Sequence, residues 1–414
     1  MKHLLRITTI LLTAASLIHA ADFRIWTSRQ GTSIEAQLLQ YKEDSVKVVT
    51  KEPKELVLKV MDLSLADRQY LIDYAGAKPD VVLAGTLSIP EHNYRKPKSF
   101  VTKLDKQFGF GDSSSLALDL YETEHFLFAV GKGVRVTGVA ETAEACWHGM
   151  AFQHFEFREN WGTTKLLVII PGDKETYNEL GKMEIAALKS VGQLEIADRI
   201  QLTWDKVGAN SMGVSTENRE EFKLKRRASI FNVDDTKRFR RKFDSFQTHV
   251  LAGDLFGIQV GGVSSISGSG YFALSTGHSY YKEIQLSKKT ETNMIASDYE
   301  DGLVTKSGFE DGSGWAKILK KLVKKGELTP NLDSILGIKG ANDLTPQNMV
   351  MMYSLAYYMQ STQSHISSYA KLIRLINTSD QIPATSEFVK IFGFDSVADF
   401  EKAWTEFVVS KDFK

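Results

Sequence analysis

The chain has 414 residues, which is enough for two or three domains. It contains 51 basic and 51 acidic residues, so its formal net charge is zero, and its charged fraction of 25% is ordinary for a globular protein. Because binding to polyanions generally needs an excess of cationic side chains, this balance argues against nucleic acid as a partner.

The first 20 residues have the pattern of a secretory signal peptide. Lys2 and Arg6 precede an apolar stretch at 7–18, and Ala20 or Ala21 ends the region where cleavage is expected. This stretch is shorter than the roughly 20 apolar residues of a membrane-spanning helix, and no later segment has the required length. We therefore expect an exported, soluble protein of the periplasm or cell envelope, with no transmembrane anchor after cleavage.

Residues 22–76 have the pattern of a small β-rich domain that ends in a helix. Apolar residues alternate with polar ones in four short segments, and polar turns separate these segments. Ser64 and Asp67 occupy the N-cap and third positions of the following helix, which is close to a capping box. The pattern predicts a small antiparallel barrel or meander with strands at 23–27, 34–38, 46–50 and 56–60.

This segment resembles the Sla-type homology domain, the first homology domain of a yeast endocytic adaptor. The shared positions are Arg24, Trp26, Thr27, Gly31, Glu35, Ala36, Val46, Leu63, Ser64, Asp67 and Tyr70. The resemblance implies an SH3-like β-barrel that binds a short peptide or a protein partner. Its candidate contact residues are Arg24, Trp26, Tyr41 and Tyr70. The alternative is a spacer domain in which Trp26 and Tyr41 only pack.

Residues 77–117 are interpreted as a linker followed by irregular chain, because they are polar and contain proline, glycine and serine. Residues 118–414 then combine strand and helix patterns, which predicts a larger, mainly α-helical α+β domain. Its first half is expected to contain strands at 124–130 and 166–170, a helix at 137–155 and a helix capped by Asp173.

The C-terminal third is predicted to be helical. In the segment 349–359, apolar residues recur at the i, i+3, i+4, i+7 spacing, and Thr345 and Pro346 supply a cap and a first-turn proline. The methionines and tyrosines of this segment are interpreted as core residues rather than as a cofactor site. Further helices are expected around Trp315, at 366–376 and at 393–404.

The centre of the chain contains a pattern close to a zinc-peptidase motif. Such a motif reads H-E-x-x-H, in which the two histidines bind zinc and the glutamate is the general base. A later helix supplies the third ligand, often within L-S-E-G-x-x-Y. Here His249 stands at the first ligand position, but Val250 replaces the glutamate, Gly253 the second histidine and Thr276 the third ligand.

The regions around His249 and Thr276, together with the segments 123–126, 170–177 and 393–404, resemble the gluzincin-type, peptidase-MA-like metallopeptidases. The resemblance implies a peptidase scaffold without its catalytic residues. Since catalytic zinc sites use three protein ligands, His249 alone cannot hold the ion tightly. His249 is therefore interpreted as a remnant or a satisfied core residue, and a rebuilt ligand at His278 is the alternative. We predict no catalytic residue and no metal or other cofactor.

Three further features have mainly structural interpretations. Cys146 is the only cysteine, so no intrachain disulfide can form, and its apolar helical surroundings predict a buried, unreactive thiol.

The Gly/Ser-rich segment 261–270 matches neither a nucleophile elbow nor a phosphate-binding loop, and is interpreted as a flexible loop. The basic clusters at 223–227 and 237–242 are interpreted as solvated helix faces, with an anionic envelope polymer or acidic partner as the alternative.

These observations favour an exported, non-catalytic protein-binding or adaptor protein of the cell envelope. Its small domain would bind the protein or peptide, and its larger domain would be a degenerate metallopeptidase scaffold. The alternative is a divergent hydrolase or metallopeptidase with a rearranged active site.

Overall fold

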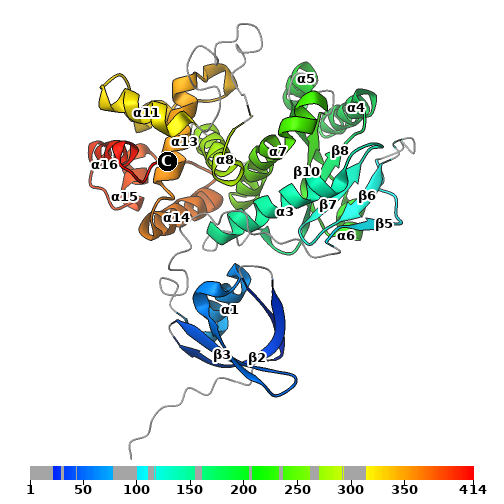
Figure 1. The fold of residues 1–414 in the computed structure, drawn as a ribbon. Helices are drawn as coiled ribbons and strands as arrows, with labels where there is room; N and C mark the ends of the chain where they lie inside the picture. The colour runs from blue at the N-terminus through cyan, green and yellow to red at the C-terminus, as the bar shows by residue number, and fades with distance from the viewer. Residues whose placement is uncertain are drawn as a thin grey trace, which may run out of the picture. The chain divides into compact units, whose positions relative to one another are not determined.

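The protein is a mixed α+β chain that divides into two compact units, residues 1–84 and 85–414 (Figure 1). The computed structural model describes residues 22–28, 32–42, 44–77, 100–110, 116, 118–153, 161–204, 208–232, 236–261, 270–290, 292 and 314–414. The expected signal peptide and most of the expected Gly/Ser-rich loop lie outside these residues. Within them, no helix has the length and apolar character that crossing a membrane requires.

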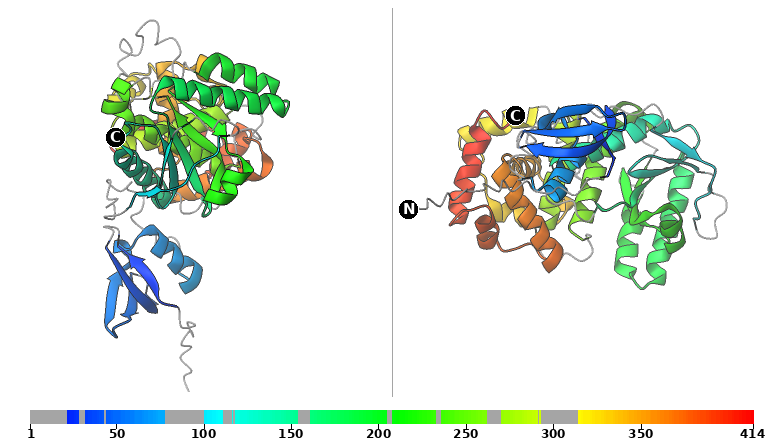
Figure 2. Two further views of the ribbon diagram at one scale, coloured as in Figure 1. Left: turned by 90° about the vertical axis from the view of Figure 1, so that its right-hand side faces the viewer. Right: turned by 90° about the horizontal axis from the view of Figure 1, so that it is seen from below.

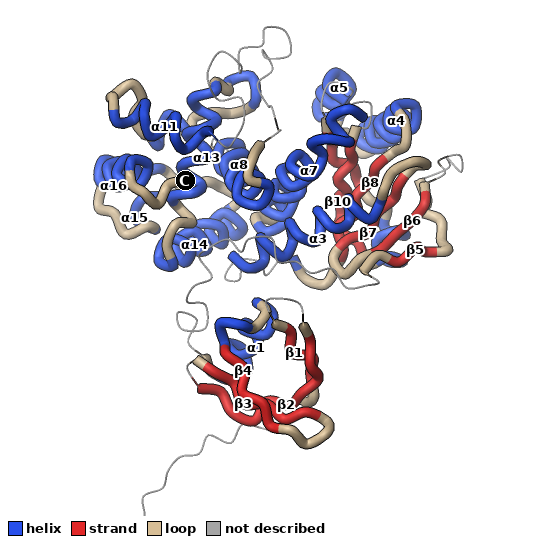
Figure 3. Tube along the Cα trace, viewed as in Figure 1, coloured by secondary structure: helices blue, strands red, loops and turns tan. Residues whose placement is uncertain are grey.

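The first unit is a four-stranded antiparallel sheet followed by a helix (Figure 3). Its elements are β1 (Arg24–Thr27), β2 (Ser33–Lys42), β3 (Ser45–Thr50), β4 (Glu55–Lys59), the 3-10 helix η1 (Val60–Asp62) and α1 (Leu65–Ala75). The strands follow one another in sequence order, as the alternating pattern predicted. A bridge between Ser28 and Leu63 brings the chain after β4 back to the end of β1, so the two edges of the sheet approach each other.

In β1, the apolar pattern suggested that Phe23 and Ile25 face the core. The structure buries the opposite face of the strand. Phe23 and Ile25 are 42% and 63% exposed, whereas Trp26 is 1% exposed. The Trp26 indole N–H donates to the carbonyl of Ala36 at 3.0 Å, so the largest side chain of the strand is buried with its polar atom satisfied. Burying one indole removes more apolar surface from water than burying the isoleucine would.

The predicted helix cap holds α1 against β1. The Ser64 hydroxyl accepts from the Asp67 N–H at 3.2 Å and donates to Asp67 Oδ2 at 2.6 Å. The buried Asp67 carboxylate also accepts from the Thr27 N–H at 2.7 Å and pairs with the Arg24 guanidinium at 2.7 Å. Burial nevertheless raises the pKa of Asp67 above its ordinary value, although these hydrogen bonds and Arg24 oppose the shift. The capping residue therefore also joins the helix to the first strand.

The second unit contains a six-stranded mixed sheet in the order β5-β6-β7-β8-β10-β9. Its strands are β5 (Thr102–Leu104), β6 (Asp119–Glu122), β7 (Phe126–Val130), β8 (Lys165–Ile170), β9 (Ala209–Gly213) and β10 (Leu224–Phe231). The three central strands are parallel, and the outer strands pair antiparallel. The short edge strand β5 lies within the segment 77–117 that was expected to be irregular, because three residues are too few to give an alternating pattern.

Helices cover both faces of the apolar central strands. The helices α3 (Val136–Gln153), α4 (Lys174–Ser190), α5 (Leu194–Thr203) and α6 (Thr216–Phe222) alternate with the strands. Alternate residues of β7 and β8 pack in one cluster with Tyr177 and Leu180 of α4. The helix α3 packs against β7 and against the long helix α7 (Thr236–Gln259), and Figure 2 shows helices on both sides of the sheet. The strands predicted at 124–130 and 166–170 and the helix between them are confirmed, as is the cap of α4, where Asp173 accepts from the Thr176 N–H at 2.7 Å.

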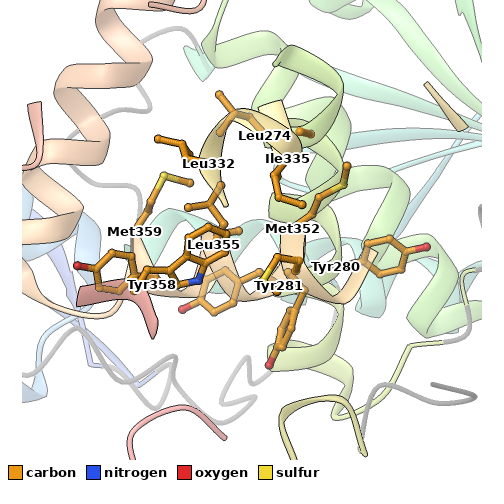
Figure 4. Close-up of a cluster of buried hydrophobic side chains, with 14 of the residues drawn as sticks. Leu274, Tyr280, Tyr281, Leu332, Ile335, Met352, Leu355, Tyr358 and Met359 are labelled. Carbon is orange, nitrogen blue, oxygen red and sulfur yellow. The ribbon is translucent and has the colours of Figure 1, made fainter. Parts of the chain in front are cut away.

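The described residues from 236 onwards form helices and the loops between them, as predicted. Its elements are α7 (Thr236–Gln259), α8 (Tyr271–Ser287), α11 (Trp315–Lys324), α12 (Leu332–Leu336), η5 (Ala341–Asp343), α13 (Pro346–Tyr358), α14 (Gln363–Ser379), α15 (Thr385–Ile391) and α16 (Val397–Val409). Met352, Leu355 and Met359 lie in a core with Tyr280 and Tyr281 of α8 (Figure 4). The methionine- and tyrosine-rich segment is therefore core, and Thr345 caps α13 by accepting from the Asn348 N–H at 3.1 Å.

Candidate functional site

The helices α7 and α8 run antiparallel and carry all four positions that the sequence matched to a zinc-peptidase site. Across the two helices, His249 Nδ1 lies 2.9 Å from Glu283 Oε2, and a Cβ atom on Gly253 would lie 3.0 Å from Ser279 Oγ. Thr276 lies three residues, or about one turn, nearer the start of α8 than Ser279. The structure therefore brings His249 and Gly253 against α8, but it places Ser279 rather than Thr276 across from Gly253.

The carboxylate of Glu283 is the centre of a buried hydrogen-bond cluster. Its Oε1 accepts from Ser245 Oγ at 2.6 Å and from Thr292 Oγ1 at 3.1 Å. Its Oε2 accepts from Thr290 Oγ1 at 2.7 Å and faces His249 Nδ1. Glu283 has no exposed surface, so this group of four partners replaces water around the carboxylate. We call these five residues the Glu283 cluster.

His249 is held as a core residue by this cluster. Its side chain is 9% exposed, and its ring packs edge-on against Tyr280 with centroids 4.5 Å apart. The interpretation of His249 as a satisfied core residue is therefore confirmed. Val250 offers no proton acceptor and Gly253 offers no ligand atom, so one imidazole remains where a catalytic zinc site needs three protein ligands.

His278, the alternative ligand, lies in different surroundings. It is fully buried, its Nδ1 lies 3.3 Å from the Tyr369 hydroxyl, and its ring packs on Phe256 with centroids 5.0 Å apart. Burial, with a smaller contribution from Lys282, holds the pKa of His278 well below its ordinary value. The ring is thus a neutral core group that hydrogen-bonds with a tyrosine, and it shares no contact with His249 in the described structure.

Cys146 is a buried and unreactive thiol, as predicted. It is 1% exposed, and its Sγ contacts Met150 Sδ at 4.0 Å and the Thr248 carbonyl at 3.8 Å. Burial raises the pKa of the thiol to about 12, so the nucleophilic thiolate is not populated near neutral pH. Through its contact with the Thr248 carbonyl, this residue contributes to the packing of α3 on α7.

One carboxyl beside these positions titrates close to neutrality. Asp254 follows Gly253 on α7, and its Oδ2 accepts a hydrogen bond from the Ser229 hydroxyl on β10. Its side chain keeps some exposed surface, but the carboxyl is densely surrounded by protein atoms, and burial raises its pKa to about 6. A carboxyl with this pKa exchanges protons more readily near pH 7 than an ordinary aspartate does.

A second histidine cluster lies at the start of β7 and on α3. His125 Nδ1 lies 2.7 Å from Glu144 Oε2, and the His125 backbone N–H donates to Glu144 Oε1 at 2.9 Å. Burial of Glu144 would raise the pKa of its carboxyl, but the bonds from His125 outweigh burial and hold the pKa below its ordinary value. His148 follows Glu144 by one helical turn, with its Nε2 3.7 Å from Glu144 Oε2.

Sequence reasoning missed this second cluster. In the sequence, Glu124 and His125 were assigned only to the predicted strand 124–130 and to the segment 123–126 of the peptidase resemblance. The available signal was the i, i+4 pair Glu144 and His148, which puts both side chains on one face of a helix. That His125 meets this face depends on how β7 packs against α3.

The four contact residues proposed for the small unit fall into two classes. Trp26 is buried, so its assignment as a contact residue is wrong, because it fills the core of the sheet. Arg24, Tyr41 and Tyr70 are each partly exposed. The Arg24 guanidinium lies 3.8 Å from the ring centre of Tyr70, and Tyr70 in turn packs against Tyr74 with centroids 4.9 Å apart.

The two basic clusters occupy different elements. Positions 224–227 belong to β10, so the helix-face interpretation is wrong for the first cluster. Its residues have local partners: Arg227 pairs with Glu184 at 3.0 Å, and the Lys225 ammonium donates to the Trp161 carbonyl. Positions 237–242 lie in the first turns of α7, as expected, but their side chains are outside the described structure.

Comparison of the chain with protein-family models, with curated proteins and with solved structures found no match. The assignment of a function therefore depends on the residues of this chain and their geometry.

Proposed function

We propose that the protein is a non-catalytic binding protein of the cell envelope, in which the small unit binds a protein or peptide partner. In this proposal the small unit is an SH3-like domain of the Sla type, and the larger unit is a metallopeptidase-like scaffold without its zinc site. The return of the chain from β4 to the end of β1 supports the first assignment. The Glu283 cluster supports the second, because an internal carboxylate engages the single remaining histidine.

The observation that carries the proposal is the exposed aromatic edge formed by Arg24, Tyr70 and Tyr74. Tyr74 is 74% exposed although it stacks on Tyr70, whose ring lies beneath the Arg24 guanidinium. Arg24 is itself fixed by the buried Asp67 carboxylate. A row of aromatic and guanidinium groups held in place in this way offers an exposed contact surface at low entropic cost, which is typical of peptide-recognition surfaces.

The composition of the unit's surface agrees with this proposal. In the part of the chain that the structure describes, nine large apolar side chains are classed as exposed, and five of them belong to the small unit. These are Phe23, Ile25, Leu39, Val57 and Tyr74. Because the small unit accounts for only 84 of the 414 residues, exposed apolar side chains are concentrated in this unit.

We expect replacement of Tyr74 with serine to weaken peptide binding at least tenfold, because loss of a hot-spot aromatic contact typically costs about 2 kcal/mol or more. The untagged chain lacking its first 21 residues would be screened against a displayed library of short peptides. Affinities of the selected peptides would then be measured by fluorescence anisotropy. Val57→Ser is the matched control, because Val57 is 70% exposed on β4 in the same unit.

Two outcomes would count against the aromatic edge as the binding surface. One is a library that yields no peptide above background. The other is a set of peptides that bind the Tyr74→Ser and Val57→Ser variants equally well. Circular dichroism of both variants would establish that each remains folded, since neither side chain is buried.

The competing proposal, a divergent hydrolase with a rearranged site, has one supporting observation. Asp254, with its pKa of about 6, lies next to the former ligand position Gly253 and has the pKa range of a general base. Turnover of peptide or ester substrates that disappears in an Asp254→Asn variant would favour this alternative. Turnover that is absent, or unchanged by the substitution, would leave binding as the function.

A further inference from the structure

Three side chains away from the zinc-motif positions on α7 and α8 lie together as metal ligands would. They lie immediately before β7 and on α3. Glu124, His125 and His148 each offer one ligand atom, and these atoms all lie within 4.8 Å of one another. His125 Nε2 lies 3.8 Å from Glu124 Oε1, and the rings of His125 and His148 are 5.3 Å apart at 83°. Small side-chain rotations would place the three ligand atoms around a common point, each at the 2.0–2.2 Å that separates zinc from its nitrogen and oxygen ligands.

The ring of His125 is fixed in the orientation that a ligand requires. Its Nδ1 faces the buried carboxylate of Glu144 at 2.7 Å, and Glu144 also binds the His125 backbone N–H. The indole of Trp147 stacks on the other side of the ring, with centroids 3.4 Å apart and planes within 12°. A histidine that binds a metal usually has its second nitrogen on a carboxylate in this way, which fixes the tautomer and increases the basicity of the free nitrogen.

The charges around His125 also favour a cation. With its proton on Nδ1, directed at Glu144, the ring has a lone pair on Nε2, which faces the second carboxylate, Glu124. Two acceptors that face each other at 3.8 Å repel unless a proton or a metal cation lies between them. A divalent ion between His125 Nε2 and Glu124 would replace this repulsion with two attractive contacts, and His148 lies close enough to add a third ligand.

We propose that Glu124, His125 and His148 form a binding site for a divalent transition metal such as zinc, with Glu144 and Trp147 as positioning residues. Two imidazoles and one carboxylate suit zinc, nickel, copper or cobalt, whereas calcium and magnesium prefer all-oxygen sites. Glu124 is exposed and both histidines are partly exposed, so an ion can reach the three ligand atoms from solvent. This site is independent of α7 and α8, and it departs from the sequence expectation that the protein holds no metal.

The test is zinc binding by the untagged chain lacking its first 21 residues, stripped with a chelator and then titrated by calorimetry. We expect one zinc per chain, and a loss of at least tenfold in affinity in each of the variants His125→Gln, His148→Gln and Glu124→Gln. His249→Gln is the matched control and is expected to bind as the parent does. Cobalt substituted for zinc should give visible absorption bands that His148→Gln alters.

The His148→Gln variant keeps the test decisive if His125→Gln fails to fold, because the His148 side chain is 39% exposed. A parent chain that binds no stoichiometric zinc would overturn the proposal. Affinity that survives in His148→Gln and Glu124→Gln would overturn it as well. Zinc that is lost only in His249→Gln would place the ion on α7, which would contradict both this proposal and the loss of the peptidase site. None of these results depends on peptide binding by the small unit.

Discussion

Replacement of Glu283 with alanine is expected to lower the free energy of unfolding of the larger unit by about 3–5 kcal/mol, the range seen when one partner of a buried ionic network is removed. His249, Ser245, Thr290 and Thr292 would all lose their acceptor in a region that water does not reach. Each donor left unsatisfied has a desolvation cost of its own. Urea unfolding followed by circular dichroism would measure the effect.

Two controls separate the network from a general effect of removing a charge. Glu283→Gln keeps the size of the side chain and one oxygen acceptor, so it should lower the stability less than Glu283→Ala does. Its amide nitrogen cannot accept from the hydroxyls that bond to the second carboxylate oxygen. Glu327→Ala removes an exposed partner of Lys325 and should change stability by well under about 1 kcal/mol. An alanine variant at 283 within about 1 kcal/mol of the parent would contradict the central role of this carboxylate.

A zinc site is expected to return on α7 and α8 when Gly253→His is combined with Ser279→Glu. Positions 249 and 253 lie one turn apart on the face of α7 that meets α8, and Ser279 lies across from Gly253. His249 already has Nδ1 on a carboxylate, which leaves Nε2 for the metal. Three ligands in place of one should raise zinc affinity by several kcal/mol, on the order of a hundredfold or more.

The matched comparison is Gly253→His with Thr276→Glu, the pair that the sequence motif suggests. Because Thr276 lies about one turn from Ser279, this pair should bind zinc more weakly than the first. Both would be built in a His148→Gln background, so that the titration reports only the site on α7 and α8. Equal affinity of the two pairs, or no gain over the background, would show that this register does not create a metal site. No hydrolysis is expected, since Val250 supplies no general base.

The proposed metal site and the positions that match a zinc-peptidase motif lie on different elements. His249 and Glu283 lie on α7 and α8, whereas the proposed site lies on α3 and immediately before β7. A metal at His125 and His148 would stabilise the helix against the chain that leads into β7, as any ligand stabilises the state that binds it. Zinc binding at one of the two places can therefore be tested independently of the other.

The sequence by itself determined the local structure of this protein. The period of two in the first unit predicted β1 to β4, and the periods of three and four predicted helices such as α13 and α14. The caps at Ser64, Asp173 and Thr345 were also predicted, because a capping side chain bonds to a backbone N–H only three residues away. These features depend on neighbours in the sequence, and so a sequence pattern contains all that is needed to find them.

Tertiary structure alone decided which distant groups meet. His249 and Glu283 are 34 residues apart, and the register of α7 on α8, which selects Ser279 instead of Thr276, follows from how two helices fit together. The inward turn of Trp26 and the meeting of His125 with Glu144 likewise depend on packing between elements. Periodicity shows which face of an element is apolar, but it does not fix the position along that face, because many registers bury similar apolar area.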